Sequence, residues 1–325
     1  MKRRTVLGSL LTIAALPRGV AAQSAPKITR IGWVTAQTAS SLAPFIDAFR
    51  DALARLGYVE GRNLVIAFRY GDGEIQRVPS LGRELAGIPV DLIVAQGNAV
   101  FEIRKLALRL PIVYAISADP VSAGFADSLS RPRGNMTGVT LMAVELNGKR
   151  LELLRELIPQ IHRVAIIGNP EHPGAHLERA FSEQTAHRLE LDIAYFPTRT
   201  RDELAGVLTR IAANPPQAIS LLADGFAIEH RAHIIDSAIR ARVPVISGWP
   251  VFAHSGALCT YGPRIPDSYR RLATYVDRVL KGAKPDDLPI EQPTQFELVI
   301  NMKTARALNV AVPSSLLVRA DEVIE

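Results

Sequence analysis

The 325-residue chain has a single cysteine, Cys259, so it cannot form an internal disulfide. The apolar stretch GALCTY around it predicts a buried side chain with no reactive role. Motifs of catalysis are also missing. We find no G-x-S-x-G elbow and no P-loop, and the GDG at 71–73 lacks the third glycine of a dinucleotide-binding turn. We therefore expect a protein that is not an enzyme and has no cofactor.

Metal-ligating side chains are sparse as well. His172 and His176 are four residues apart, and Glu229, His230 and His233 form a second small group. Neither group adds a cysteine or a third well-spaced histidine, and positions on the surface of a helix explain both. The sequence predicts no metal site.

The first residues decide the expected compartment. Three basic residues at 2–4 precede the apolar run Val6–Leu16, which is too short for a bilayer span of roughly 20 residues. Val20 and Ala22 supply small residues for cleavage, so we expect a signal peptide over 1–22. The Arg3-Arg4 pair fits a twin-arginine signal imperfectly, and ordinary Sec export remains an alternative. With no cysteine at the cleavage site, a periplasmic protein without a lipid anchor is expected.

Removal of this segment lowers the net charge of the protein. The whole chain has a formal charge of +6, and residues 1–22 hold four basic and no acidic side chains. The mature protein therefore carries +2, with scattered basic residues. This distribution gives no basic patch for nucleic acid.

Beyond residue 28, short apolar strands alternate with amphipathic helices. The strands are continuous apolar runs, such as VDLIVAQ and PIVYAIS, which is typical of a parallel sheet covered on both faces. The alternation pauses over 119–143, a stretch rich in Gly, Pro, Asn and Ser, and then resumes. This pattern predicts an α/β fold of two doubly wound parallel-sheet lobes with a ligand cleft between them.

Ligands of such sheets bind beyond the carboxyl ends of the strands, where unpaired N–H groups of helix starts suit an anion. The candidate ligand-binding residues follow from this rule: Thr35, Gln96, Gly97, Asn98, Ser117, Asp119, Asn169, Asp224, Trp249 and Tyr261.

Several of these positions have a second interpretation. Asp119-Pro120 is a favourable helix start without any ligand, and Asn98, Asn169 and Asp224 are equally good helix caps. Asp119 and Asp224 are the best candidates to pair with a ligand ammonium group. Among the tryptophans, Trp33 lies within a strand and is expected in the core, whereas Trp249 is expected at the hinge or cleft rim.

Four stretches carry a family likeness: LGYVEGRNLVI (56–66), DPVSAGFADSLSRPRGNMTGV (119–139), YGP (261–263) and the tail from YVDRVLKG onward. They resemble the ABC-transporter substrate-binding family that includes tryptophan receptors. The resemblance implies a type I periplasmic-binding-protein-like fold in which the chain crosses between lobes three times. It implies lobe 1 over 27–118 plus 250–284, and lobe 2 over 119–249 plus 285–325.

The chain departs from its relatives at one turn. Small residues are usual there, whereas this chain has Gln96-Gly97-Asn98, so the wall of its pocket should be more polar. That departure argues against copying a bulky aromatic ligand from a relative.

The expected function is a periplasmic solute-binding receptor of an ABC importer, a monomer that closes its lobes on an amino acid or other small carboxylate. Its partners would be that small molecule and an ABC permease in the inner membrane, with no nucleic acid. The alternative is a periplasmic ligand-sensing protein that feeds a membrane signalling receptor. Neighbouring permease and ATPase genes would favour the first role.

Overall fold

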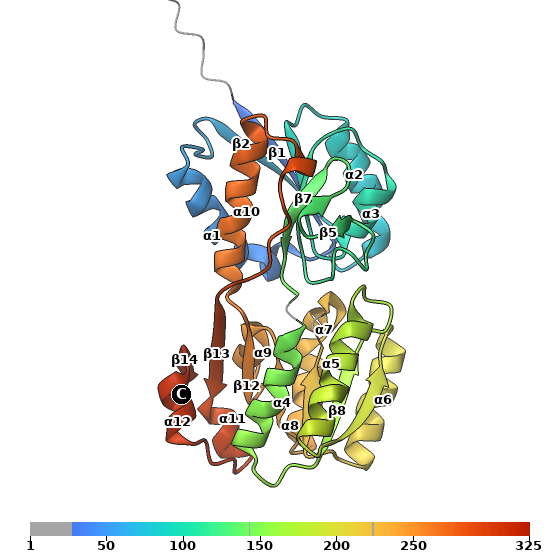
Figure 1. Ribbon diagram of the computed structural model, residues 1–325, viewed down its shortest axis with the longest axis vertical. Helices are drawn as coiled ribbons and strands as arrows, with labels where there is room; N and C mark the ends of the chain where they lie inside the picture. The colour runs from blue at the N-terminus through green and yellow to red at the C-terminus, as the bar shows by residue number, and fades with distance from the viewer. Residues whose placement is uncertain (1–27, 143, 223) are drawn as a thin grey trace, which may run out of the picture.

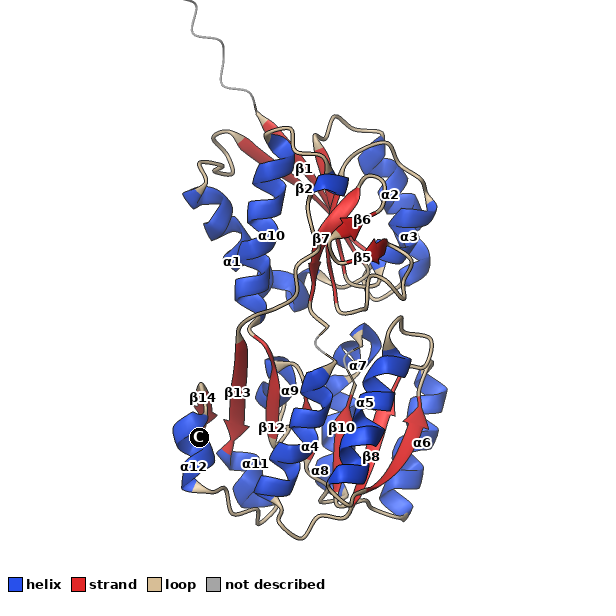
Figure 2. Cartoon of the chain, viewed as in Figure 1, coloured by secondary structure: helices blue, strands red, loops and turns tan. Residues whose placement is uncertain are grey.

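The computed structural model describes residues 28–142, 144–222 and 224–325. The expected signal peptide, residues 1–22, lies outside these ranges. The described chain forms two α/β lobes, one above the other in Figure 1, and Figure 2 shows helices on both faces of each sheet. The predicted fold class is confirmed.

The upper lobe is built on a five-stranded sheet of order β2-β1-β3-β4-β7, in which every pair is parallel. Its strands are β1 (Thr29–Thr35), β2 (Leu64–Tyr70), β3 (Leu92–Gln96), β4 (Ile112–Ile116) and β7 (Met136–Thr140). Its helices are α1 (Ala39–Arg55), α2 (Val78–Ala86), α3 (Ala99–Lys105) and α10 (Ile265–Leu280). Short elements complete it: η1 (Ile75–Arg77), β5 (Ala126–Ser128), β6 (Arg131–Pro132) and η2 (Pro285–Asp287).

Both faces of this sheet are buried. Trp33 of β1 points toward α1, where its ring lies 5.0 Å from that of Phe49, and the next residue, Val34, packs on the opposite face with Leu85 of α2. Side chains alternate between the faces of a strand, so a strand covered on both sides must be apolar at every position. The continuous apolar runs in the sequence have this cause, and Trp33 is a core residue, as predicted.

The lower lobe contains a seven-stranded sheet of order β14-β13-β12-β11-β10-β8-β9. Its strands are β8 (Arg163–Gly168), β9 (Asp192–Pro197), β10 (Ala218–Leu221), β11 (Val245–Ser247), β12 (Cys259–Pro263), β13 (Phe296–Asn301) and β14 (Glu322–Ile324). Helices α4 (Glu145–Leu157) and α5 (Ala175–Arg188) lie on one face, and α6 (Arg201–Ala213), α8 (Arg231–Arg240) and α9 (Pro250–His254) lie on the other. The remaining helices are α7 (Gly225–Glu229), α11 (Met302–Ala307) and α12 (Ser314–Arg319).

One pair in this sheet departs from the parallel pattern. β13 runs antiparallel to β12, while the other pairs are parallel. β12 leads out of the lobe and β13 leads back into it, so the two must run in opposite directions. Cys259 of β12 is 0% exposed, as predicted.

The chain passes between the lobes three times. It leaves the upper sheet after β7 and enters α4 at Glu145, returns between β12 and α10, and leaves again between Glu291 and β13. Glu291 still pairs with Val139 of the upper lobe.

All three crossings fall later than the predicted boundaries at 118/119, 249/250 and 284/285. The stretch 119–143 has the composition of a linker, yet its end forms β7, whose five residues are all buried. GALCTYG was assigned to lobe 1, but β12 pairs with β11 and β13 in the lower sheet. The composition indicates where the alternation of strands and helices is interrupted. The pairing of the strands determines the lobe to which each segment belongs.

Two glycines allow a very close backbone approach below the hinge. A Cβ on Gly262 would lie 1.7 Å from the carbonyl oxygen of Gly248, whereas a Cβ on Gly206 of α6 would meet nothing within 4 Å. We expect Gly262→Ala to lower the free energy of unfolding by about 2–3 kcal/mol, because the obstacle is backbone. The matched Gly206→Ala should raise it by up to about 1 kcal/mol through helix propensity. Denaturant unfolding measures both, and equal effects would contradict this packing.

Candidate functional site

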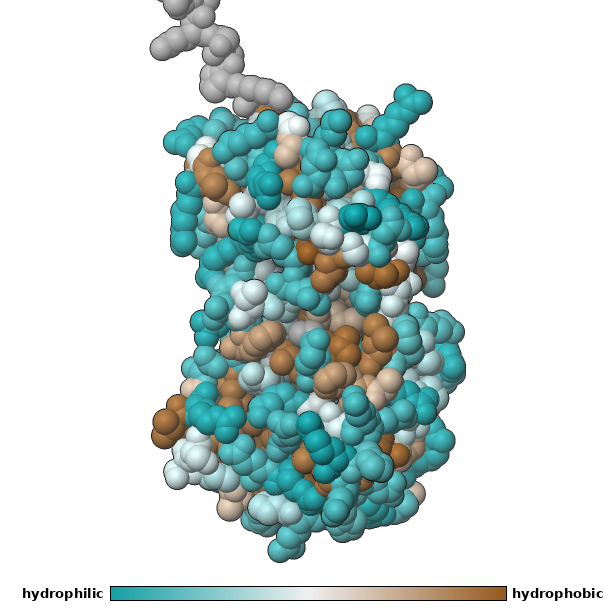
Figure 3. Space-filling view, in the orientation of Figure 1, coloured by the Kyte–Doolittle hydropathy of each residue, from teal (hydrophilic) through white to brown (hydrophobic). Residues whose placement is uncertain are grey.

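A cleft of about 480 Å³ lies between the lobes, and residues of both lobes line it. It is at the carboxyl ends of β1, β3 and β4 above and of β8, β10 and β11 below, where strand-end reasoning places a ligand. Figure 3 shows the molecule narrowed at this level. Seven of the ten predicted residues line the cleft: Thr35, Gln96, Gly97, Asn98, Ser117, Asn169 and Trp249.

Two of these residues are already bonded to each other. The Thr35 hydroxyl donates to Oε1 of Gln96 at 2.6 Å, and the two residues are 0% and 4% exposed. Gln96 also hydrogen-bonds Tyr269, whose pKa is raised by burial, and that bond opposes the rise. Both ends of the Gln96 amide are thus engaged within the upper lobe. Gln96 forms a fixed part of the wall, and the polar character expected of the Gln96-Gly97-Asn98 turn falls mainly on Asn98.

Asn98 is half-buried and faces the lower lobe. Among the described residues, it accepts no side-chain cap bond from the start of α3, so capping does not explain it. Its Nδ2 lies 3.6 Å from the point where a Cβ on Gly225 would be. Asn98 is therefore a polar group of the upper lobe that lies beside Gly225 of the lower lobe on the cleft lining.

The two predicted carboxylates act as local caps. Asp119 accepts from the backbone N–H groups of Val121 at 2.7 Å and Ser122 at 3.0 Å, and Asp224 accepts from Phe226 at 3.1 Å. Neither carboxylate lines the cleft. Their pairing with a ligand ammonium group stays a prediction.

Tyr261 also lies away from the cleft lining. Its ring is 6.4 Å from that of Phe296, and its carbonyl accepts from Nε of the buried Arg150 at 3.0 Å. Asn169, which does line the cleft, accepts from the backbone N–H of Glu171 at 3.0 Å and so shapes the loop after β8.

Sequence reasoning missed several side chains of the lining. Arg199 and Arg201 follow β9, and Asp72 and Glu74 follow β2. The carboxyl ends of β2 and β9 also face the cleft, so the rule that ligands bind beyond strand ends covers all four residues. The cleft is also lined by Phe226 and Glu229 of α7 and by His230, the residue after that helix.

The lower lobe presents cations to the cleft. Arg199 is paired with Glu171 at 3.3 Å and Glu203 at 3.0 Å. Arg201, the first residue of α6, forms no ion pair within the described part of the chain. Its guanidinium and the positive end of a 13-residue helix therefore make a suitable environment for an anion.

His230 lies beside this arginine. Its ring packs edge-on against Phe226, with the ring centroids 4.4 Å apart. Burial lowers the pKa of His230 and the charge of Arg201 lowers it further, while Glu229 opposes the shift, so the neutral imidazole is favoured at neutral pH. The neutral ring and Phe226 give the lower wall an aromatic surface next to the cation.

The sequence predicts a position on the surface of a helix for His172, and the structure shows that this prediction is wrong. His172 lies in the loop before α5 and is 6% exposed. Burial is the main cause of its lowered pKa, and the charge of Asp224 opposes that shift. The neighbouring Pro173 carbonyl accepts from the backbone N–H of Asp119 at 3.3 Å, which links this loop to the upper lobe.

The described ranges contain no group of three or more His, Cys, Asp or Glu side chains placed to hold a metal ion. No helix in them is long and apolar enough to cross a bilayer.

Two α/β lobes, three crossings and a cleft at the strand ends define a protein of the type I periplasmic-binding class. The model of the family described as ABC transporter substrate binding protein matches residues 36–324. The chain belongs to that family, and the resemblance noted in the sequence is confirmed.

Three similar proteins share less than 25% of their residues with this chain. A tyrosine-binding protein of Clostridioides difficile (strain R20291) is 22% identical over 263 residues, which cover 80% of this chain and 75% of the relative. An ABC domain from Streptococcus pneumonia, solved in complex with L-Trp, is 24% identical with a TM-score of 0.84, over 92% of this chain and all of the other. A conserved domain protein from Vibrio cholerae is 22% identical with a TM-score of 0.82, over 92% of this chain and 99% of the other. These structures share the fold.

The buried His172 predicts a pH dependence of stability. Its pKa is lowered in the folded chain, so the unfolded chain binds a proton there at higher pH, and the free energy of unfolding must fall as pH drops below about 6.5. We expect His172→Gln to show a smaller fall than the wild type between pH 7 and 5 in denaturant titrations. An unchanged fall would mean that His172 does not titrate differently on unfolding.

Proposed function

We propose that this protein is the solute receptor of an ABC importer and binds an amino acid in the cleft. The observation that carries the proposal is Arg201, a cation without an ion pair among the described residues, beside the aromatic surface of Phe226 and His230 in a cleft of about 480 Å³. A volume of this size is typical of a site for one small molecule.

Each part of an amino acid has a complementary group. The ligand carboxylate pairs with Arg201 at the start of α6. Glu74 and Glu229 supply carboxylates on the cleft lining for the ammonium group. Phe226 and Trp249 supply surface for the side chain. Because the Gln96 amide is occupied within its own lobe, the Gln96-Gly97-Asn98 turn does not argue strongly against an aromatic side chain.

The names of the relatives support the same ligand class. One relative is named for tyrosine and one similar structure holds L-Trp. We therefore place tryptophan and tyrosine first among the ligands of this chain. Export to the periplasm, and delivery of the ligand to a membrane permease by the closed form, complete the proposed role.

A thermal-shift screen of residues 23–325 against the amino acids tests the ligand class. A ligand at 100 times its Kd should stabilise the protein by about 2.7 kcal/mol. We expect Arg201→Gln to weaken binding of the best ligand at least tenfold, because one charge-assisted bond to its carboxylate is lost. The control is Arg188→Gln on the outer face of α5, which should leave the affinity unchanged. A response to sugars alone, or an equal affinity in both variants, would overturn the assignment.

Closure of the lobes is tested at Gly225. Alanine fits there, because its Cβ would be 3.6 Å from the Asn98 amide, but a leucine side chain would extend into the opposite lobe. We expect Gly225→Ala to bind ligand like the wild type. Gly225→Leu should bind at least tenfold more weakly and show no decrease in the radius of gyration with ligand in small-angle X-ray scattering. Normal compaction of Gly225→Leu would exclude closure at this contact.

A further inference from the structure

A second cavity, of about 370 Å³, adjoins the cleft. Gln37, Ile228 and Trp249 line both spaces and so form the partition between them. The other walls of the second cavity come from the starts of α1, α8, α10, β13 and β14 and from α9. Both lobes therefore contribute to it, as they do to the cleft.

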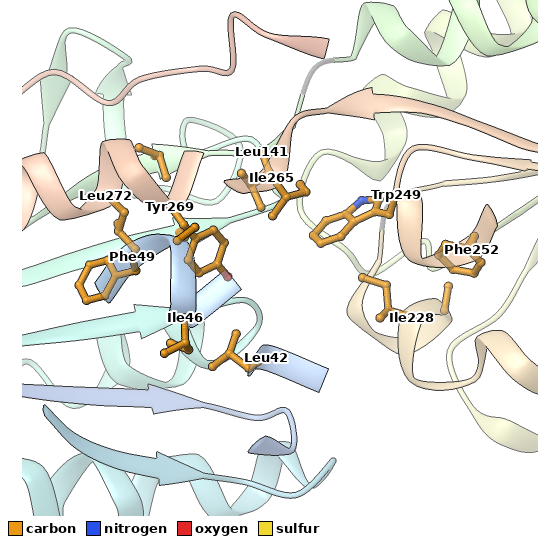
Figure 4. Close-up of a cluster of buried hydrophobic side chains, with 14 of the residues drawn as sticks. Leu42, Ile46, Phe49, Leu141, Ile228, Trp249, Phe252, Ile265, Tyr269 and Leu272 are labelled. Carbon is orange, nitrogen blue, oxygen red and sulfur yellow. The ribbon is translucent and has the colours of Figure 1, made fainter. Parts of the chain in front are cut away.

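The inner walls of the second cavity are apolar and well fixed. Ile228 and Trp249 are each 7% exposed, and Ile265 is 1% exposed. Figure 4 shows the Trp249 indole between Ile265 on one side and Ile228 on the other. Phe45 closes the cavity from α1, where its ring stacks on Tyr269 at 5.3 Å. Such walls suit a compact hydrocarbon or aromatic group.

The rim carries two carboxylates, Glu297 and Glu322, and one arginine, Arg231, whose guanidinium donates to the Ile228 carbonyl at 2.8 Å. Glu297 has a side chain 18% exposed and lies 3.9 Å from Arg264, but that arginine makes its short contact, at 2.7 Å, with Asp321. Burial raises the pKa of Glu297; Arg264 opposes the rise, and the neighbouring carboxylates add to it. The second rim carboxylate, Glu322, contacts His254 at 2.9 Å. Glu297 is thus a half-buried carboxylate whose charge is incompletely balanced.

A further acceptor is on the partition. Oε1 of Gln37 is buried and has no hydrogen-bond partner among the described residues. A buried acceptor without a donor costs roughly 1–3 kcal/mol, so a ligand N–H group that reaches it is favoured. The carboxylate of Glu297 and the amide oxygen of Gln37 both accept hydrogen bonds, so a ligand with an N–H donor is favoured. The carboxylates of Glu297 and Glu322 repel an anion.

We propose that the second cavity binds a small organic amine. Its ammonium group pairs with Glu297, and its apolar body packs against Phe45, Ile228 and Trp249. The second cavity differs from the cleft in its charged groups: one arginine, Arg231, and the carboxylates of Glu297 and Glu322 line it, whereas two arginines and three carboxylates line the cleft. The proposal does not depend on which solute the cleft takes.

Isothermal titration of the mature protein with phenethylamine tests the proposal. 3-Phenylpropionate has a similar body with the opposite charge and serves as the matched ligand control. We expect phenethylamine to bind and 3-phenylpropionate to leave this site empty. Glu297→Gln keeps the shape of the side chain and removes its charge, so it should weaken amine binding at least tenfold, which is about 1.4 kcal/mol.

Two further variants locate the ligand. Ser40→Phe, at an exposed position that lines the second cavity, should fill the space and weaken amine binding without disturbing the core. Asn98→Ala, which alters only the cleft, should leave amine binding unchanged. Loss of amine binding in Asn98→Ala but not in Glu297→Gln would place the amine in the cleft and overturn the proposal. Absence of binding by the wild type at millimolar phenethylamine, or binding of 3-phenylpropionate that Ser40→Phe weakens as strongly as it weakens amine binding, would also overturn it. The amino-acid screen of the cleft is a separate measurement, so either proposal can fail alone.

Discussion

One apolar cluster contains buried side chains of both lobes, and Trp249 lies within it. The cluster begins with Trp33 in the upper lobe and continues past Trp249 to Phe252 in the lower lobe. The position of Trp249 is in turn fixed from below, because the preceding residue, Gly248, lies against Gly262 too closely for any side chain. The wall of the cleft that Trp249 forms is therefore packed in place before a ligand binds. Interiors packed at this density do not deform gradually, so motion of the lobes must be confined to the crossing segments.

Polar groups at the strand ends divide into those that the fold uses and those that remain for a ligand. Buried polar groups need partners, and this requirement explains why Thr35 bonds Gln96 and why Asp224 caps its own loop. Arg201 forms no ion pair with another described residue, so its charge is available to a ligand. The internal bonds keep the wall rigid, so a ligand meets a pre-organised surface and loses less free energy to ordering it.

The sequence was sufficient for the two lobes and for most of the cleft. Apolar runs identified strands covered on both faces, and the strand-end rule brought Asn98, Ser117, Asn169 and Trp249 to one cleft. It was insufficient where tertiary pairing decides. The strand β7 lies in a stretch with the composition of a linker, and the direction of β13 follows from the crossing before it. Whether an Asp caps a helix or faces a ligand depends on side-chain direction, which residue type and spacing do not specify.

The partition between the two cavities has a thermodynamic consequence. Ile228, Trp249 and Gln37 each present surface to both spaces, so an occupant of one cavity constrains the same side chains that the other occupant contacts. If an amine in the second cavity favours the arrangement of the two lobes that the cleft ligand also favours, each ligand tightens the binding of the other by the same factor. If it favours a different arrangement, each weakens the other equally. Because both lobes line both cavities, this coupling acts through the equilibrium between open and closed lobes, and a ligand shifts that equilibrium only by its difference in affinity for the two states.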